Sequence, residues 1–311
     1  HGGYGMIPIR AFVADIYRAG SITAAAQQLF ISQPALSADL KRLENELGVT
    51  LFDRTTSPIS LTDAGRVYVQ ALEDIGKISD DLQTQLDELK GLRVGRLSVG
   101  GAHFIASCLL LQLTRDFCRR YAGIAVDVFE GNSATLTQQV LQNELDLLLD
   151  YDFDAALFTA QPILRENILL CVPKAYARAG ALLRGDIIAG RHLDTAPTDL
   201  AAFRDAPFIL LRAGNNMYEH AVALCAAAGF TPHVTFSFDQ LMTAYEAAVQ
   251  GLGVTFVSDE IVRTVSDDDA VAYYPLAGEA AHRTLYIAGK KRRYCSSAKK
   301  TFIDFAAEYC Q

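Results

Sequence analysis

Residues 21–48 read SITAAAQQLFISQPALSADLKRLENELG, and this stretch decides the fold of the N-terminal region. Ser21 and Ser32 each precede a helical pattern, where a hydroxyl can accept a hydrogen bond from a free backbone N–H of the first turn. Pro34 falls in a first turn, where its missing N–H costs little, and Gly48 ends the second pattern. The stretch therefore predicts two helices joined by a tight turn.

The second of these helices carries an apolar stripe along one face. The stripe consists of Leu36, Leu40, Leu43 and Leu47. If it faces inward, the outward face of the first turns consists of Gln33, Pro34, Ser37, Ala38 and Lys41. A helix-turn-helix places such a face in the major groove of DNA, where Gln33 can hydrogen-bond a base edge. The same pattern also suits the solvated face of any small helical domain, and the pattern alone does not separate the two.

Further elements flank this pair of helices. An apolar stripe closed by Gly20 predicts an earlier helix; it consists of Phe12, Val13, Ile16 and Ala19. Residues 51–61 read LFDRTTSPISL, which is two short extended stretches around a Thr/Ser/Pro turn. This pattern predicts either a β wing or a plain surface hairpin. In a wing, Arg54, Thr55, Thr56 and Ser57 would reach DNA phosphates.

A long helical pattern begins after Thr62 and runs to about Leu89. Its seam alternates spacings of four and three residues over Ala64, Tyr68, Ala71, Ile75, Ile78, Leu82, Gln85 and Leu89. The helix would be on the order of 40 Å long and cannot bury this seam alone. We expect it to pair with a second copy of the chain, and the alternative is that it packs against the chain's own domain.

From residue 96 onward, short apolar runs alternate with helical patterns. The first strands are expected at 96–100, 124–130 and 145–149, with helices at 103–121 and 133–143 between them. This order predicts a parallel sheet with right-handed crossovers. An extended stretch follows at 162–172, a second alternating unit covers 207–257, and a short helix is expected from Ser258. Two further strands are expected at 270–275 and 284–288, and a last helix at 296–309. Two α/β lobes joined by extended crossings predict a hinged sensor that binds its ligand beyond the carboxyl ends of strands.

The composition is that of an ordinary globular protein, with 311 residues, 50% of them hydrophobic, and a net charge of −8. No apolar run approaches the roughly 18 residues of a membrane span, and residues 1–6 hold no apolar signal core. We therefore expect a cytoplasmic protein that starts at Met6. Residues 6–65 carry five basic and six acidic side chains, although DNA affinity usually rests on neutralising phosphates. The DNA-binding prediction therefore rests on motif geometry.

Catalytic and metal-binding motifs are missing from the sequence. It has no Gly-x-Gly-x-x-Gly, Gly-Lys-Ser/Thr, Gly-x-Ser-x-Gly or His-Glu-x-x-His motif. The six histidines show no metal-ligand spacing, and the six cysteines form no Cys-x-x-Cys pair. We expect no enzymatic activity, no cofactor and no metal.

Five N-terminal motifs closely resemble the DNA-binding region of LysR-type transcriptional regulators. In order they read SITAAAQQL (21–29), SQPALS (32–37), LENELG (43–48), LFDR (51–54) and LTDAG (61–65). The resemblance implies an α/β protein with a helix-rich N-terminal domain: a winged helix-turn-helix, a long linker helix, and a two-lobed α/β effector-binding domain like type 2 periplasmic binding proteins.

The resemblance also implies a function. A protein of this kind would be a bacterial cytoplasmic regulator that binds inverted repeats of double-stranded DNA as a homodimer or homotetramer. A small molecule between its lobes would switch its activity, and RNA polymerase is a candidate further partner. The alternative is a solute-binding protein with no regulatory role, which would need an export signal and no DNA-binding region.

The resemblance divides the chain into a DNA-binding domain (6–65), a linker and dimerisation helix (66–91) and an effector-binding domain (92–311). Lobe I would take about 92–165 and 275–311, and lobe II about 166–274. Gln33, Pro34 and Ser37 match the groove-facing residues of the family, and Arg54 matches its wing arginine. We expect Lys41, on the same helix face, and Thr55, in the wing, to contact DNA as well. Ala38-Asp39 replaces the basic or amide pair that members often carry, which removes a phosphate contact.

Three segments look similar to the ligand loops of the family, at 100–103, 131–133 and 214–218. The candidate effector contacts are Gly101, Ala102, His103, Asn132, Ser133, Asn215, Asn216 and Tyr218. Helix N-termini offer free N–H groups and partial positive charge, so we expect an anionic or strongly polar metabolite. Two alternatives stay open. Asp150, Asp152 and Asp154 would favour a cation or a zwitterion, and Ser133 and Asn215 can serve as plain helix caps.

Overall fold

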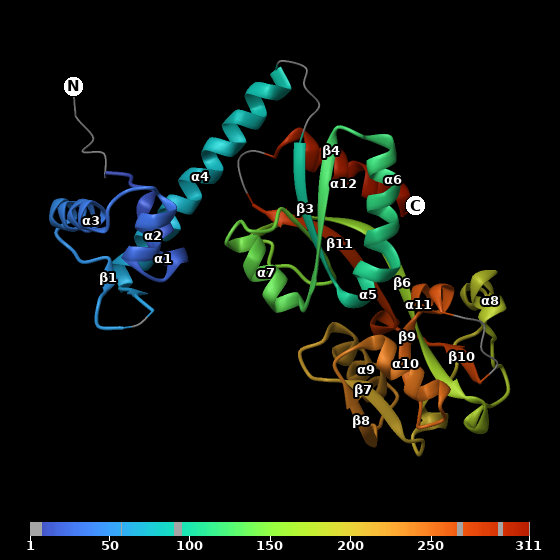
Figure 1. Cartoon of the computed structure of the whole chain (residues 1–311). Coiled ribbons are helices and arrows are strands. Elements are labelled where there is room, and N and C mark those ends of the chain that lie inside the picture. The colour runs from blue at the N-terminus through green and yellow to red at the C-terminus, as the bar shows by residue number, and fades with distance from the viewer. Residues whose placement is uncertain (1–7, 57, 90–94, 266–269, 292–294, 311) are drawn as a thin grey trace. The chain divides into compact units, whose positions relative to one another are not determined.

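The computed structural model describes residues 8–56, 58–89, 95–265, 270–291 and 295–310; for 77, 80, 81, 83–85 and 87–89 it describes the backbone alone. The chain divides into two compact units, His1–Lys90 and Gly91–Gln311 (Figure 1). Met6, Ser57 and most of the helix break expected at 91–95 lie outside the described residues. None of the helices within the described ranges is both long and apolar enough to span a membrane.

The first unit contains short helices, a two-stranded wing and one long helix. Its elements are α1 (Phe12–Ala19), α2 (Ile22–Gln28), α3 (Gln33–Leu47), β1 (Phe52–Asp53), β2 (Ser60–Leu61) and α4 (Asp63–Leu89). As predicted, the Oγ atoms of Ser21 and Ser32 accept hydrogen bonds from the backbone N–H three residues later, at 3.0 and 3.4 Å. Gly20 and Gly48 end α1 and α3 with φ of 67° and 70°, a left-handed conformation that glycine adopts readily.

The core of the first unit forms around the leucine stripe of α3. Leu36, Leu40 and Leu43 are buried against α1 and α2, and Leu47 is partly buried at the end of the helix. The prediction that this stripe faces inward is confirmed. Gly65, near the start of α4, lies so close to the chain before β1 that a Cβ atom there would be 2.0 Å from the carbonyl oxygen of Leu51. The glycine is therefore required for the close approach of α4 to the wing.

The second unit begins with a parallel sheet. Its strands and helices are β3 (Gly95–Ala102), α5 (His103–Ile105), α6 (Leu111–Arg120), β4 (Ile124–Gly131), α7 (Ser133–Leu141) and β5 (Leu147–Asp150), with α12 (Ser297–Tyr309) at the end of the chain. The helix expected at 103–121 is interrupted by a π turn, Ala106–Leu110. Strand β3 pairs in parallel with both β4 and β5, as predicted. The carboxyl ends of the three strands therefore lie at one edge of the sheet.

The rest of the second unit follows the predicted order with one addition. The elements are β6 (Phe158–Pro173), α8 (Arg184–Ile188), β7 (Phe208–Leu211), α9 (Asn216–Ala227), β8 (Val234–Phe238), α10 (Leu241–Val249), β9 (Thr255–Ser258), α11 (Asp259–Thr264), β10 (Val271–Pro275) and β11 (His282–Lys290). Helix α8 lies in a segment for which the sequence pattern predicts no helix or strand. Strands β7 and β8 pair in parallel.

Strand β6 is shared by the two parts of the second unit. Its residues 158–167 pair with β11, which also pairs with β5. Its later residues pair with β9 and β10, and all of these pairings are antiparallel. The first crossing from one lobe to the other therefore occurs inside one continuous strand (Figure 1). The sequence pattern predicts that this segment is extended but does not predict its partners.

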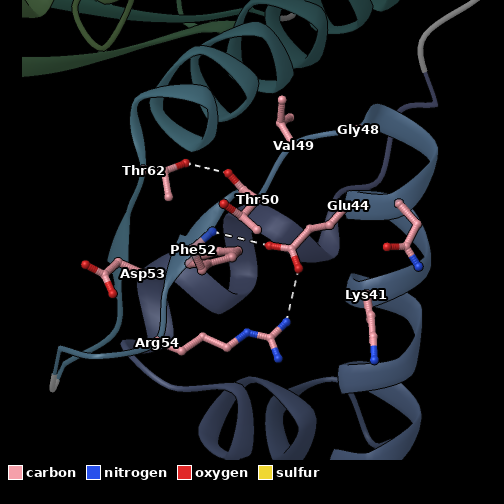
Figure 2. A pocket seen from close by; sticks show the side chains of 10 residues that line it. Lys41, Glu44, Gly48, Val49, Thr50, Phe52, Asp53, Arg54 and Thr62 are labelled. Carbon is pink, nitrogen blue, oxygen red and sulfur yellow. Dashed lines mark hydrogen bonds and ion pairs between the residues drawn. The ribbon is translucent and has the colours of Figure 1, made fainter.

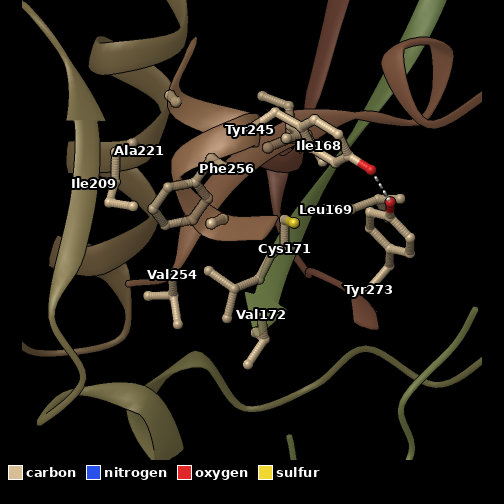
Figure 3. Close-up of a cluster of buried hydrophobic side chains, with 14 of the residues drawn as sticks. Ile168, Leu169, Cys171, Val172, Ile209, Ala221, Tyr245, Val254, Phe256 and Tyr273 are labelled. Carbon is tan, nitrogen blue, oxygen red and sulfur yellow. Dashed lines mark hydrogen bonds between the residues drawn. The ribbon is translucent and has the colours of Figure 1, made fainter. Parts of the chain in front are cut away.

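Each part of the second unit has its own apolar core. The core around β6, β7 and β9 includes Leu169, Cys171 and Phe256, and within it the hydroxyls of Tyr245 and Tyr273 lie 3.2 Å apart (Figure 3). Burial raises the pKa of the Cys171 thiol and of the Tyr273 phenol, so both stay protonated. All six cysteines are free thiols.

Candidate functional site

The outward face of α3 is presented as the sequence pattern predicts. Gln33, Pro34 and Lys41 are exposed and Ser37 is half-buried, on the side opposite the buried leucines. Ser32 caps the helix by accepting the N–H of Ala35, and Pro34 in the first turn has no N–H to leave unpaired. The face can therefore offer an amide, a hydroxyl and an ammonium group to a partner without disturbing the core.

The wing is a hairpin whose loop is held in part by side chains. Phe52 pairs with Leu61, and Asp53 with Ser60. Asp53 Oδ1 accepts the backbone N–H of Thr55 at 2.9 Å and its hydroxyl at 2.6 Å, and these bonds lower the pKa of Asp53. The hydroxyl proton of Thr55 is therefore already used inside the wing, beside a carboxylate.

Glu44 joins α3 to the wing, a role that the sequence pattern does not predict. Its buried carboxylate accepts the backbone N–H of Leu51 at 2.8 Å and of Phe52 at 3.4 Å. It also holds the guanidinium of Arg54 at 3.1 Å (Figure 2). One signal was present in the sequence: Glu44 follows Leu40 by four residues and so falls on the buried stripe. A charge at such a position needs partners, and the wing supplies them.

Arg54 and Lys41 line the same open groove between α3 and the wing, of about 750 Å³. Figure 2 shows Arg54 extended from the wing toward α3, while Glu44 and Lys41 project from that helix. The Arg54 side chain is 45% exposed, so guanidinium donors that do not bind Glu44 face the solvent. The arrangement can place a cation of fixed orientation against a phosphate.

The seam of α4 divides into two parts. Tyr68 is buried in the core of the first unit, where its hydroxyl donates to the carbonyl of Pro8 at 2.6 Å. Beyond it, Ile75, Ile78 and Leu82 are 40%, 65% and 54% exposed. The seam positions Gln85 and Leu89 lie where only the backbone is described. The later part of the seam thus leaves a row of apolar side chains in water.

The lobe I effector candidates gather at the carboxyl edge of the parallel sheet. Gly101 and Ala102 end β3, and Ala102 lies beside Gly131 of β4 in the pairing register. His103 follows directly, and its Nδ1 pairs with the carboxylate of Glu130. Asn132, and not Ser133, caps α7 by accepting the N–H of Thr135 at 2.8 Å. These segments, far apart in sequence, meet at one edge.

Ser133 contacts a buried carboxylate. Asp150, at the end of β5, accepts hydrogen bonds from the Ser133 side chain and from the backbone N–H of Tyr151, the latter at 2.8 Å. Burial nevertheless raises the pKa of Asp150, and these hydrogen bonds only oppose that shift. The interpretation of Ser133 as a plain cap is wrong, because its hydroxyl is directed to Asp150.

The lobe II candidates lie at the start of α9. Asn215 is the helix cap, and its Oδ1 accepts the N–H of Met217 at 2.9 Å. Asn216 Nδ2 donates to the carboxylate of Asp152 at 2.7 Å, a contact between the two parts of this unit. Tyr218 is half-buried and packs against the lobe II core. Of the three, Asn216 is the residue that reaches the sheet edge.

A buried polar network holds the crossing strands beside this edge. Glu166 of β6 and Arg283 of β11 form an ion pair at 2.5 Å, and the hydroxyl of Tyr151 donates to Glu166 at 3.1 Å. The Arg283 guanidinium also lies 3.8 Å from the centre of the Tyr151 ring. Asp259 of α11 accepts both the backbone N–H and the side-chain amide of Asn167, at 2.9 and 2.7 Å. Sequence spacing gave no signal for these pairs.

Within the described ranges, no group of three or more His, Cys, Asp or Glu side chains is placed to hold a metal ion.

Two family models match the chain. Residues 9–66 match the bacterial regulatory helix-turn-helix protein, lysR family, and residues 90–311 match the LysR substrate binding domain. The chain belongs to the LysR family of transcriptional regulators.

The chain is similar to known proteins over nearly its whole length. The LysR family chain is 31% identical to the uncharacterized HTH-type transcriptional regulator YcgK of Bacillus subtilis (strain 168), over 97% of this chain and 94% of that protein. Its fold is similar to that of full-length CbnR crystallised with its target DNA, with a TM-score of 0.63 at 19% identity, over 96% of this chain and 97% of that one.

A second solved structure also has a fold similar to that of this chain. A full-length OxyR variant from Pseudomonas aeruginosa matches with a TM-score of 0.68 at 20% identity, over 98% of this chain and 95% of that one.

The two family models and the relative in Bacillus subtilis together show that this chain is a DNA-binding transcriptional regulator with an effector-binding domain. A solute-binding role alone is not favoured, because the helix-turn-helix match covers residues 9–66.

Proposed function

We propose that this regulator reads inverted-repeat DNA with Gln33, Pro34 and Ser37 of α3 in the major groove, while Lys41 and Arg54 contact the phosphates. The observation that supports this most is the pairing of an exposed polar face with a half-exposed arginine held beside it. Thr55 is the weaker wing candidate, because its hydroxyl donates to Asp53. We place the protein in the cytoplasm and assign it no enzymatic activity.

The DNA proposal is tested by mobility shifts on a duplex that the wild-type protein selects from a random-sequence pool. Gln33→Ala is expected to relax the preference by about 1–3 kcal/mol at one base pair, because the amide of Gln33 is assigned to a base edge. Gln250→Ala, an exposed glutamine at the end of α10, serves as a matched control. Equal losses on selected and shuffled duplexes would show that Gln33 reads no base.

We further propose that the chain assembles through the later part of α4. The exposed row of Ile75, Ile78 and Leu82 supports this, since apolar side chains at such spacing are buried when two helices pair. Ile75→Asp with Ile78→Asp should weaken both self-association and DNA binding. Val67→Asp, an exposed position off the seam, is the matched control. A wild-type protein that sediments as a monomer at micromolar concentration contradicts this proposal.

We propose that the effector binds at the carboxyl edge of β3, β4 and β5, between lobe I (about 92–165 and 275–311) and lobe II (about 166–274). The pairing of β6 first with β11 and then with β9 and β10 supports this division. The Asn216–Asp152 contact supports the position, because it joins the two lobes at that edge.

The chemistry of the edge refines the expected effector. Helix N-termini alone indicate an anion, but Ser133 at the start of α7 already binds Asp150, and Asn216 at the start of α9 already binds Asp152. A polar molecule that carries a positive as well as a negative group, such as an amino acid, suits these partners better than a plain anion.

Thermal-shift measurements with amino acids, amines and dicarboxylic acids test this assignment, because a ligand that binds the folded state raises the melting temperature. We expect the largest shift from a zwitterion. Ser133→Ala should reduce the shift, and the affinity loss should be about 1 kcal/mol if the hydroxyl also binds the ligand. Shifts from dicarboxylic acids alone would restore the anionic assignment.

A further inference from the structure

Phe30 lies in the turn between α2 and α3, and its side chain is 95% exposed. Its backbone has a φ of 56°, in the left-handed region. The turn is fixed by the N–H of Phe30, which donates to the carbonyl of Gln27 at 3.2 Å, and by the N–H of Ile31, which donates to the carbonyl of Ala26 at 3.0 Å. The ring of Phe30 is not part of the apolar core of this unit.

Both features of Phe30 oppose stability. A left-handed backbone is strained for a residue with a Cβ atom, whereas glycine and asparagine adopt it readily. The turns that follow α1 and α3 use glycine, at Gly20 and Gly48. An aromatic ring in water also gains none of the free energy that burial supplies. Folding alone would favour glycine or asparagine at position 30, and strain that persists in this way marks a functional position.

The stretch of chain around Phe30 is mostly exposed and carries no charge. Phe30 comes two residues before the cap Ser32 and three before Gln33, at the end of α3 that is assigned to the groove. Residues 19–38 contain no Asp, Glu, Lys or Arg. A ring at this position is therefore suited to an apolar part of DNA and not to a phosphate.

We propose that Phe30 is a further DNA-contact residue, whose ring packs on an apolar group at the edge of the groove read by Gln33. Such a group is a thymine methyl or a deoxyribose. The inference rests on the proposed function of α3, and it explains why a strained, exposed ring stands where the fold itself would use another residue.

The test compares full-length wild-type protein with Phe30→Asn and Phe30→Leu. Asparagine removes the ring and tolerates the left-handed backbone, so it should raise the melting temperature by a few degrees. The same change should weaken binding to a selected duplex by roughly tenfold, because the ring loses its burial against DNA. Leucine keeps an apolar side chain and should give an intermediate affinity at unchanged stability. Tyr17→Asn, an exposed aromatic on α1, is the control.

Three duplexes separate the two apolar groups: the selected site, the same site with uracil in place of thymine, and a shuffled sequence. A loss that disappears on the uracil duplex assigns the thymine methyl. An equal loss on all three assigns the deoxyribose. Unchanged affinity of Phe30→Asn on every duplex overturns the inference, and a lowered melting temperature overturns the strain argument. A wild-type protein that binds no duplex would instead overturn the proposed function.

Discussion

The DNA-binding unit and the effector unit each contain a buried glutamate paired with an arginine, and the pairs differ in how much of the arginine is exposed. In the first unit the side chains of Glu44 and Arg54 are 9% and 45% exposed. In the second unit those of Glu166 and Arg283 are 2% and 4% exposed. The glutamate–arginine pair is therefore partly exposed in the first unit and fully buried in the second.

The difference shows what each pair does. Glu44 binds backbone N–H groups of the wing as well as Arg54, and the arginine keeps donors in water. Arg283 is enclosed by Glu166 and the Tyr151 ring, where β11 pairs with β6. We infer that the first pair orients a cation toward a partner, whereas the second holds two strands together. Salt should therefore weaken the first pair far more than the second.

The largest expected effect is on the enclosed pair. Arg283→Met should lower the free energy of unfolding by about 3–5 kcal/mol, because it leaves the carboxylate of Glu166 buried without its partner. Urea unfolding of the full chain measures this loss. Adding Glu166→Gln should recover part of it, since the uncompensated charge is then removed. A loss below about 1 kcal/mol would mean that the pair is solvated and that the two pairs are alike.

Removing the carboxylate of the other pair should have a smaller effect on folding. Glu44→Ala should cost about 1–3 kcal/mol, because the N–H of Leu51 loses its acceptor. It should also weaken DNA binding, since Arg54 loses the group that orients it. Glu46→Ala, an exposed glutamate on the same helix, is the control for urea unfolding and mobility shifts. An unchanged DNA affinity for Glu44→Ala would contradict the orienting role.

Arg54→Ala sharpens the comparison further, because it should affect binding more than folding. We expect about 0.2–1 kcal/mol of lost stability, as is usual for a half-exposed pair. Affinity should fall alike for all sequences, and the slope of log affinity against log salt should decrease by about one unit. Arg18→Ala on α1 is the control, as an exposed arginine paired with Asp15. A loss confined to one sequence would assign Arg54 to a base.

The smallest expected effect concerns Asp150, a buried carboxylate for which no ion pair is described. Burial raises the pKa of Asp150, so the folded state holds this proton more tightly than the unfolded chain does. Asp150 contributes its full stabilisation of the folded state at a pH below about 3.9, the pKa of an aspartate in the unfolded chain. That stabilisation is lost as the pH rises through the higher pKa of Asp150 in the folded state. Asp150→Asn should therefore raise the melting temperature at pH 7 but not in acid. A gain independent of pH would show another cause.

Several features could be predicted because they depend on residues close together in the chain. The caps at Ser21 and Ser32 use a backbone N–H three residues away, and the leucine stripe follows from helical spacing. Glu44 was missed although it lies on that stripe, since its partners belong to the wing. The buried pair of Glu166 and Arg283 had no such signal, because 117 residues separate the two side chains.

The sequence by itself determined the family, the helix-turn-helix with its exposed face, and the order of strands and helices in the lobes. These follow from capping, periodicity and motifs that span a few residues, where local hydrogen bonds and burial patterns decide the outcome. Only the tertiary structure decided that Glu44 pairs with Arg54, that Phe30 is strained and exposed, and that aspartates meet the helix N-termini at the sheet edge. Those outcomes depend on which distant groups burial brings within hydrogen-bond distance, and chain order alone does not specify this.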